Sequence, residues 1–188
     1  MSKILIIVAH PKIDSLSMAM AQKYKDIKES MGLEVELLDL YREENPQPFF
    51  TYEDSNNIST DSMKKYQKKI EDANELVFVF PYWWGSYPAI LHNFIDWNFS
   101  RGFAFEYVDS RPKGRLQGRS VTVFTTTGAP SFVYALSGAN RRIKTTFKKQ
   151  VVEFCGMNLR SFNIFGGVDS STAKSDKILQ KVESIAKS

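Results

Sequence analysis

The chain has 188 residues, 43% of them hydrophobic, which is enough for one hydrophobic core and short for two, so we expect a single domain over residues 1–188. The net charge is +4, and residues 111–160 hold ten Lys and Arg against one acid, a distribution that suits an anionic ligand or a solvated helix face. No zinc, helix-turn-helix or RNA-binding motif accompanies this charge, so we expect no nucleic-acid partner.

Cysteine usage and hydropathy bear on the compartment. The single cysteine, Cys155, cannot form an internal disulfide and has no partner at metal-ligand spacing, so we expect a reducing compartment, no metal and a buried, inert thiol. The longest apolar run near the start, "ILIIVA", is too short to span a bilayer and lacks a signal-cleavage pattern. We therefore predict a soluble, cytoplasmic protein without membrane insertion.

Short apolar runs rich in Ile, Val and Phe alternate along the chain with longer segments of helical period. The runs are "KILIIVAH" at 3–10, "EVELLDL" at 34–40, "ELVFVFP" at 75–81, "SVTVFTTT" at 120–127 and "LRSFNIFGG" at 159–167. The helical segments are 15–31, 61–74, 89–99, 140–155 and 172–186. Five strands each followed by a helix predict an α/β domain with a parallel sheet and helices on both faces, because parallel strands need crossover connections.

The connection at 41–60 is long, carries two prolines and shows no periodicity. Loops of this length in compact domains are commonly functional. Its segment "PFF" at 48–50 is predicted to cover a pocket or a neighbouring subunit.

Ligands of open α/β sheets bind beyond the carboxyl ends of the strands, so the loops after the first, third and fourth strands are the candidates. The first loop, "AHPKIDSLSMAMA", places Ser15 and Ser17 where a helix begins. Helix starts present unpaired N–H groups and partial positive charge, which predict a phosphate site. Plain N-capping by Asp14 or Ser15 is the alternative. His10 is expected to donate to a phosphate oxygen or to serve as a hydrogen-bonded histidine at the strand end.

This first loop has neither the G-x-G-x-x-G of a dinucleotide-binding unit nor a P-loop. The second candidate loop is "PYWWGSYP" at 81–88 and the third is "TTTGAPSFVY" at 125–134. Gly128 in the third loop allows close backbone approach to a ligand. Aromatic walls with convergent donors suit a planar heterocycle that carries a phosphate tail, and together the loops favour a flavin. Core or dimer-interface tryptophans are the alternative.

Six segments carry a resemblance to a known family. They are "AHP" with "SLSMAMA", "FPYWWGSYPAIL", "GFAFEY", "GRLQGRSVTVFTTTG", "FVYALSG" and "FCGMN", and the second is the most specific. Over nearly its whole length the chain resembles the NAD(P)H:quinone oxidoreductases with a flavodoxin-like fold. This group contains DT-diaphorase, the modulator-of-drug-activity enzymes and the ancillary reductases of potassium efflux systems. The resemblance implies a doubly wound five-stranded parallel sheet of order 2-1-3-4-5.

The resemblance also implies a flavin site. The first loop would surround the flavin phosphate and ribityl chain, the tryptophan segment would follow the isoalloxazine ring, and the third loop would line its polar edge. The implied cofactor-binding residues are His10, Ser15, Leu16, Ser17, Pro81, Tyr82, Trp83, Trp84, Gly85, Thr126, Thr127, Gly128, Ala129 and Tyr134. FMN is the expected cofactor and FAD the alternative, because the carboxyl-terminal extension of the mammalian enzymes is missing.

The family's substrate-facing aromatic segment corresponds to Phe105, Glu106 and Tyr107. By resemblance these residues would reach the pocket of a partner subunit, because family members are usually homodimers with the active site at the subunit interface. A homodimer is therefore expected.

The resemblance implies ping-pong transfer of a hydride from NAD(P)H to the flavin and then to a quinone or a related electrophile. The N–H groups near Gly128 and Ala129, with the Tyr134 phenol, would stabilise negative charge on the flavin. The alternative for Tyr134 is an aromatic that only packs. The family histidine six residues later is Asn140 here, which can hydrogen-bond but cannot take a proton. Pro130 removes one backbone donor where the family often has glycine.

Several interpretations stay open from the sequence. The acceptor is a quinone, an azo or nitro compound or an aldehyde-like electrophile, and NADH and NADPH are equally compatible. Arg141 and Arg142 either meet a 2′-phosphate or face solvent. The alternative function is a flavin-binding, redox-sensing regulatory subunit of a membrane transporter, because one fold can host both roles. A one-electron flavodoxin carrier fits poorly with the basic charge and the aromatic segment.

Overall fold

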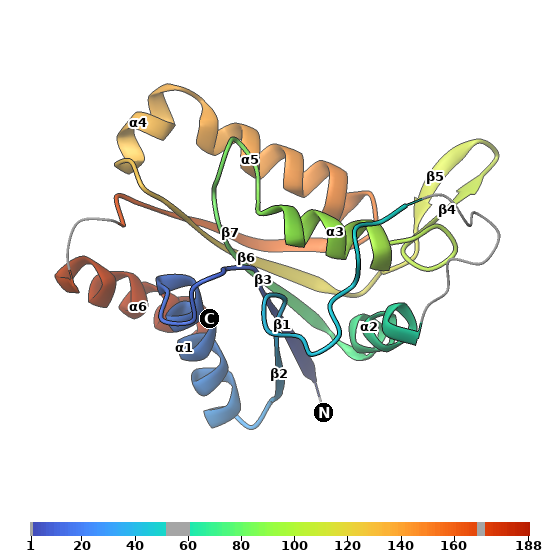
Figure 1. Cartoon of the computed structure of the whole chain (residues 1–188), viewed down its shortest axis with the longest axis horizontal. Helices are drawn as coiled ribbons and strands as arrows, with labels where there is room; N and C mark the ends of the chain where they lie inside the picture. The colour runs from blue at the N-terminus through green and yellow to red at the C-terminus, as the bar shows by residue number, and fades with distance from the viewer. Residues whose placement is uncertain (1, 52–60, 169–171) are drawn as a thin grey trace.

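The computed structural model describes residues 2–51, 61–168 and 172–188. Five parallel strands form the central sheet in the order β2-β1-β3-β6-β7 (Figure 1). The strands are β1 (Lys3–Val8), β2 (Glu34–Asp39), β3 (Glu75–Pro81), β6 (Ser120–Thr127) and β7 (Asn158–Gly166). Counted among themselves they have the order 2-1-3-4-5, so the predicted doubly wound α/β sheet is confirmed.

Helices cover both faces of this sheet (Figure 1). On one face, α1 (Leu16–Ser30) and α6 (Thr172–Lys187) bury residues against Ile4, Ile6 and Val8 of β1. On the other face, α2 (Asp61–Asp72), α3 (Ala89–Asn98) and α5 (Ala139–Phe147) pack in the cluster that holds Leu5 and Ile7. Successive residues of a strand point to opposite faces, which explains why every apolar residue of β1 is buried.

A two-stranded antiparallel hairpin, which the sequence pattern did not predict, follows α3. It consists of β4 (Phe105–Val108) and β5 (Arg111–Gly114), and its turn residues Asp109 and Ser110 have φ angles of 51° and 63°. Both angles lie in the left-handed region, where Asn-Gly or Gly-Gly is the usual choice. The sequence gives little sign of this hairpin, because the turn lacks glycine and because Pro112 argues against a strand. Proline is tolerated here because β5 has a free edge.

The helical segment predicted at 140–155 is found at 139–153 and is less regular than expected. A short helix, α4 (Ser131–Leu136), precedes α5, and a π-helical turn, η1 (Lys148–Glu153), continues α5. Phe147 and Val152 are both fully buried. They are five residues apart, which matches the i to i+5 spacing of a π turn and brings both side chains onto the sheet.

Three expectations about composition can be compared with the described residues. Cys155 is a buried free thiol, as predicted. Among the residues that the structure covers, no group of three or more His, Cys, Asp or Glu side chains is arranged to hold a metal ion. None of the helices within the described ranges has the length and apolar character needed to cross a membrane.

Candidate functional site

The three candidate loops meet at the carboxyl edge of the sheet. The loops after β1 and β3 touch through His10 and Trp83, whose ring centroids lie 5.7 Å apart. The loop after β3 is joined to the end of β6, where Tyr82 N–H donates to the Thr126 carbonyl at 2.8 Å. The Tyr82 ring also meets Tyr134 edge to face, at 5.6 Å between centroids. Residues as far apart in the chain as His10 and Tyr134 thus lie at the same edge of the sheet.

A fourth loop, after β7, also belongs to this edge. Gly167 N–H donates to the Ala129 carbonyl at 2.9 Å, and Val168 N–H donates to the Thr127 carbonyl at 3.3 Å. The Thr127 hydroxyl donates to the same Ala129 carbonyl at 3.1 Å. These bonds fix the backbone of the loop after β6 on both sides of Gly128. The sequence analysis missed this loop because it considered the strands near the point where the strand order reverses, whereas β7 is an edge strand.

The start of α1 combines capping with free hydrogen-bonding capacity. Ser15 is the N-cap, and its hydroxyl accepts from Met18 N–H at 3.2 Å, so the O–H remains a donor for a further partner. Ser17, in the first turn, is 1% exposed, and its hydroxyl has no hydrogen-bond partner among the described residues. A buried unpaired hydroxyl is costly unless a ligand satisfies it, so this end of the helix is chemically suited to an oxyanion.

His10 stands beside this helix start. Its Nδ1 lies 3.1 Å from Lys12 N and 3.2 Å from Lys12 O, so the Lys12 backbone engages this nitrogen. Burial of the ring lowers the pKa of His10, and the nearby positive charges of Arg42 and Lys12 lower it further. A neutral imidazole with Nε2 left for another partner is therefore the form expected at neutral pH.

The tryptophans occupy a tight turn. Trp83 and Ser86 exchange two backbone hydrogen bonds of 2.9 Å, while Trp84 and Gly85 between them have φ angles of 51° and 80°. Positive φ at both central residues is the pattern of a type I′ turn, which favours Asn, Asp or Gly. Trp84 is 104% exposed, so it is no core residue. Because neither packing nor backbone preference explains this tryptophan, a flat ligand or partner is the better physical reason.

The turn is anchored to α3 by contacts that sequence reasoning missed. The Ser86 hydroxyl lies 2.9 Å from His92 Nε2, and the His92 ring stacks on Tyr87 at 3.8 Å between centroids. Partial burial lowers the pKa of His92. One helical face thus holds the base of the turn while the tip stays exposed. The sequence could have indicated this contact, because His92 stands one helical turn after the segment "GSYP".

Two further buried oxygens lie near the gathered loops. Thr125 Oγ1 of β6 and Asn140 Oδ1 at the start of α5 have no hydrogen-bond partner among the described residues. Thr125 directly precedes the predicted ring-edge residues, and Asn140 follows Tyr134 by six residues. Unpaired polar atoms of this kind fit a ligand that supplies N–H or O–H groups, and a flavin ring and its ribityl chain carry such groups.

The hairpin residues do not join this edge within one chain. Figure 1 shows the β4–β5 hairpin at the far end of the molecule from α4. Phe105 packs on Phe154 at 4.8 Å between centroids, and Glu106 pairs with Arg115 at 3.4 Å. Tyr107 is half exposed. The chain therefore brings together the predicted cofactor residues and leaves the predicted substrate segment apart.

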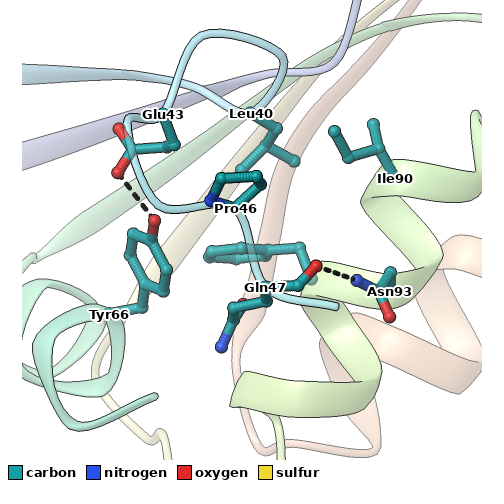
Figure 2. Close-up of a pocket in the computed structure, with 8 residues that line it drawn as sticks. Leu40, Glu43, Pro46, Gln47, Tyr66, Ile90 and Asn93 are labelled. Carbon is teal, nitrogen blue, oxygen red and sulfur yellow. Dashed lines mark hydrogen bonds between the residues drawn. The ribbon is translucent and has the colours of Figure 1, made fainter. Parts of the chain in front are cut away.

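A cavity of about 40 Å³ lies elsewhere, beneath the loop that follows β2. In Figure 2, Pro46 and Gln47 of this loop lie over it, and the Tyr66 hydroxyl donates to Glu43 Oε2 at 2.6 Å. The volume holds one or two water molecules and is far too small for a flavin ring. Pro46 and Gln47 of the long connection line this cavity, whereas residues 48–50, the segment predicted to cover a pocket or a neighbouring subunit, are not among its lining residues, so that prediction stays untested. Residues 52–60 of the connection lie outside the described residues.

Comparison with known proteins agrees with this fold. Residues 2–188 match the Flavodoxin_2 family, which is described as a flavodoxin-like fold. The chain is 28% identical to an uncharacterized NAD(P)H oxidoreductase of Haemophilus influenzae, with 93% of this chain and 89% of the relative covered. It is 29% identical to human ribosyldihydronicotinamide dehydrogenase [quinone], with 84% of this chain and 78% of the relative covered.

A solved structure shares the fold. It is an FMN-dependent NADH-azoreductase from Bacillus anthracis in complex with FMN, with a TM-score of 0.80 and 20% sequence identity. The alignment covers 100% of this chain and 98% of that one.

Proposed function

Because the chain belongs to the Flavodoxin_2 family, we propose that it is a flavin-dependent NAD(P)H oxidoreductase that reduces quinones or related electrophiles by two electrons. One observation carries this proposal: the loops after β1, β3 and β6 meet at the carboxyl edge, carry an exposed tryptophan, and adjoin elements that hold unpaired buried hydroxyls. The relatives named above are an NAD(P)H oxidoreductase and a quinone dehydrogenase, which supports the same reaction class.

FMN is the proposed cofactor, with FAD as the alternative. The FMN complex of the fold neighbour supports FMN, and so does the chemistry of the donor set. At the phosphate end, the free hydroxyl capacity of Ser15 and Ser17 and the His10 Nε2 would bind oxygens, with Leu16 between them. When bound, the flavin supplies the hydride chemistry between NAD(P)H and the acceptor.

The remaining residues would orient the ring and stabilise charge. Residues 81–85, which include both exposed tryptophans, would flank the flat face. Thr126 and Thr127, with the backbone of Gly128 and Ala129, would line the polar edge, where fixed donors stabilise developing negative charge. Tyr134 would add a phenolic O–H. Asn140 would hydrogen-bond without carrying a proton.

A homodimer would complete the site. The hairpin with Phe105, Glu106 and Tyr107 lies away from the loops of its own chain, so a second copy would have to supply it. Exposed apolar side chains on α4, at Phe132 and Leu136, lie close to Tyr134 in the chain and would be covered in such an assembly. The quinone-type acceptor would then bind between the two subunits.

The alternative of a transporter regulatory subunit is not favoured, because the named relatives are oxidoreductases and dehydrogenases. A cytoplasmic location is proposed from the single, unpaired cysteine.

The proposal is tested by the visible absorption spectrum of the purified protein. A yellow protein that NAD(P)H bleaches, and that regains colour when a quinone is added, is the expected result. Acid release and mass measurement of the chromophore then separate FMN from FAD. A colourless protein that takes up no added flavin would overturn the proposed function, and flavin binding without oxidation of NAD(P)H would overturn the enzyme class. The absorption assay needs no membrane partner, so turnover by the isolated protein also counts against a purely regulatory role.

A further inference from the structure

Arg42, just after β2, reaches back to the loop after β1. Its Nη1 donates to the His10 carbonyl at 3.3 Å, and its Nη2 donates to the Pro11 carbonyl at 2.6 Å. The guanidinium thus holds two successive carbonyl groups of the loop that leads to the start of α1. Nothing in the sequence pattern pointed to this contact, because it joins residues 31 and 32 positions apart.

Asp39 fixes the guanidinium in this position. Asp39 Oδ2 accepts from Arg42 Nη1 at 2.7 Å, and Asp39 Oδ1 accepts from Tyr41 N–H at 3.0 Å. The carboxylate is mostly buried, with 12% of its side chain exposed, and it ends β2 next to β1 in the sheet. Hydrogen bonds from a charged donor are stronger than neutral ones, and a planar guanidinium positions its partners better than a flexible ammonium does.

The loop is therefore held from two sides. His10 Nδ1 engages the Lys12 backbone within the loop, while Arg42 holds the His10 and Pro11 carbonyls from the neighbouring strand end. Residues 10–12 lead directly to Ser15, the N-cap of α1, whose first turn contains the unpaired Ser17 hydroxyl. Displacement of the His10–Pro11 backbone would move the entry to that turn, since a loop of three residues, 12–14, separates them.

We propose that Arg42 is a positioning residue for the phosphate end of the cofactor site. It fixes the backbone of residues 10–11 so that His10, Ser15 and Ser17 converge on one oxyanion. Its Nη1 and Nη2 donate to protein carbonyls and to Asp39, so it acts through the loop. This role rests on the proposed flavin function and identifies the residue on which phosphate recognition depends.

The chain contains a matched control. Arg119 makes the same kind of contact at the opposite edge of the sheet, with Nε donating to the Ile70 carbonyl at 3.1 Å and Nη2 donating to the Glu71 carbonyl at 2.6 Å. Arg119 Nη1 also donates to the Gln117 carbonyl at 3.4 Å, so Arg119→Ala removes one positive charge and three carbonyl contacts without touching the loop after β1. Arg42→Ala removes one positive charge, two carbonyl contacts and the pair with Asp39. It reports what general loss of charge or stability does to flavin binding.

The test compares FMN with riboflavin, which lacks the phosphate, by fluorescence titration of wild type, Arg42→Ala, Arg42→Lys and Arg119→Ala. Both Arg42 variants are expected to lower the ratio of FMN affinity to riboflavin affinity by about tenfold, because the loss concerns the phosphate end. Arg119→Ala is expected to keep the wild-type ratio. Arg42→Lys retains the positive charge. A wild-type ratio of FMN to riboflavin affinity in this variant would show that the charge, and not the loop geometry, matters, and would overturn the proposal.

A second measurement needs no flavin. Amide hydrogen exchange of residues 12–18 in the flavin-free protein is expected to be faster in the Arg42 variants than in wild type and Arg119→Ala. If wild type binds FMN while the Arg42 variants keep its affinity ratio and exchange rates, only the role of Arg42 fails. If wild type binds neither flavin, the proposed function fails and the role of Arg42 fails with it. Should Arg42→Ala not fold, Arg42→Lys alone decides.

Discussion

The Asn93 side chain on α3 forms hydrogen bonds with the Phe50 backbone and with the backbone of the residues just before it. Its Oδ1 accepts from Phe50 N–H at 2.9 Å, and its Nδ2 donates to the Gln47 and Pro48 carbonyls at 3.1 and 3.0 Å. Trp97 Nε1 donates to the same Pro48 carbonyl at 2.7 Å. One turn of helix thus fastens the described part of the long connection after β2, which has no regular structure of its own.

The first prediction follows from this contact. Asn93→Ala is expected to lower the free energy of unfolding by about 1–3 kcal/mol, because it removes three hydrogen bonds to partly buried backbone groups of the loop. Denaturant unfolding followed by far-ultraviolet circular dichroism measures this change. Asp96→Ala, on the exposed side of the same helix, is the control and should change stability by less than about 0.5 kcal/mol. Equal effects of the two substitutions would contradict the assignment.

The second prediction separates stability from binding at Trp84. Trp84→Gly removes a side chain that is fully exposed and relaxes a left-handed backbone, so the free energy of unfolding should stay within about 1 kcal/mol of wild type. Flavin affinity should fall several-fold, by about 0.5–1.5 kcal/mol, because an aromatic contact is lost. Met31→Ala, an exposed apolar residue at the end of α1, is the control for titration. Unchanged flavin affinity in Trp84→Gly would exclude Trp84 from the site.

The sheet and its helical cover were predictable because burial on both faces produces unbroken apolar runs such as "ILIIV" and "LVFVF". The β4–β5 hairpin was not, since Asp109 and Ser110 lack the glycine that marks a two-residue hairpin turn and Pro112 argues against a strand. Apolar runs and helical periodicity can be recognised within a short stretch of sequence. The hairpin instead depends on a backbone conformation that these residue types adopt rarely.

The site was predictable in outline only. Loops at one edge follow from the topology of a parallel sheet, so the convergence of His10, Trp83 and Tyr134 could be expected. The contact of Arg42 with the His10 carbonyl could not, because side chain–backbone bonds between distant loops leave no periodic pattern. The same holds for the bond between Ser86 and His92.

The third prediction concerns the phenol of Tyr134. Tyr134→Phe keeps the ring that meets Tyr82 but removes the O–H, so flavin should stay bound while reduction by NAD(P)H slows about tenfold or more. Stopped-flow absorbance at the flavin band measures this rate. Tyr41→Phe, in the loop after β2, is the control. An unchanged rate in Tyr134→Phe would leave Tyr134 with a packing role only.

The fourth prediction concerns the thiol of Cys155. Burial raises the pKa of this thiol to about 12 and leaves 3% of the residue exposed. Since the thiolate is the reactive form, the folded protein should not react with a disulfide reagent near neutral pH. The same protein in guanidinium chloride should react with one equivalent. Rapid reaction of the folded protein would show that the segment around Cys155 opens readily.

The last prediction is a pH dependence at Glu183, which links α6 to α1. Its carboxylate pairs with Lys187 at 2.5 Å and with Lys23 at 2.9 Å, and these bonds, that of Lys187 first, lower the pKa of Glu183 from 4.5 to about 2. The folded pKa lies below the unfolded one, so the pairs stabilise the fold above about pH 4.5, and this contribution is lost as the pH falls toward 2.

Glu183→Gln should therefore lower the thermal unfolding midpoint at neutral pH and match wild type more closely in acid, because the substituted side chain has no proton to gain. The difference between the two midpoints, followed by circular dichroism from neutral pH into the acid range, measures the effect. Added salt should shrink the difference at neutral pH, since both pairs are partly exposed. Glu29→Gln, in the exposed pair with Lys25 on α1, is the control. Parallel curves for Glu183→Gln and wild type at every pH would show that the two pairs contribute nothing to the docking of α6.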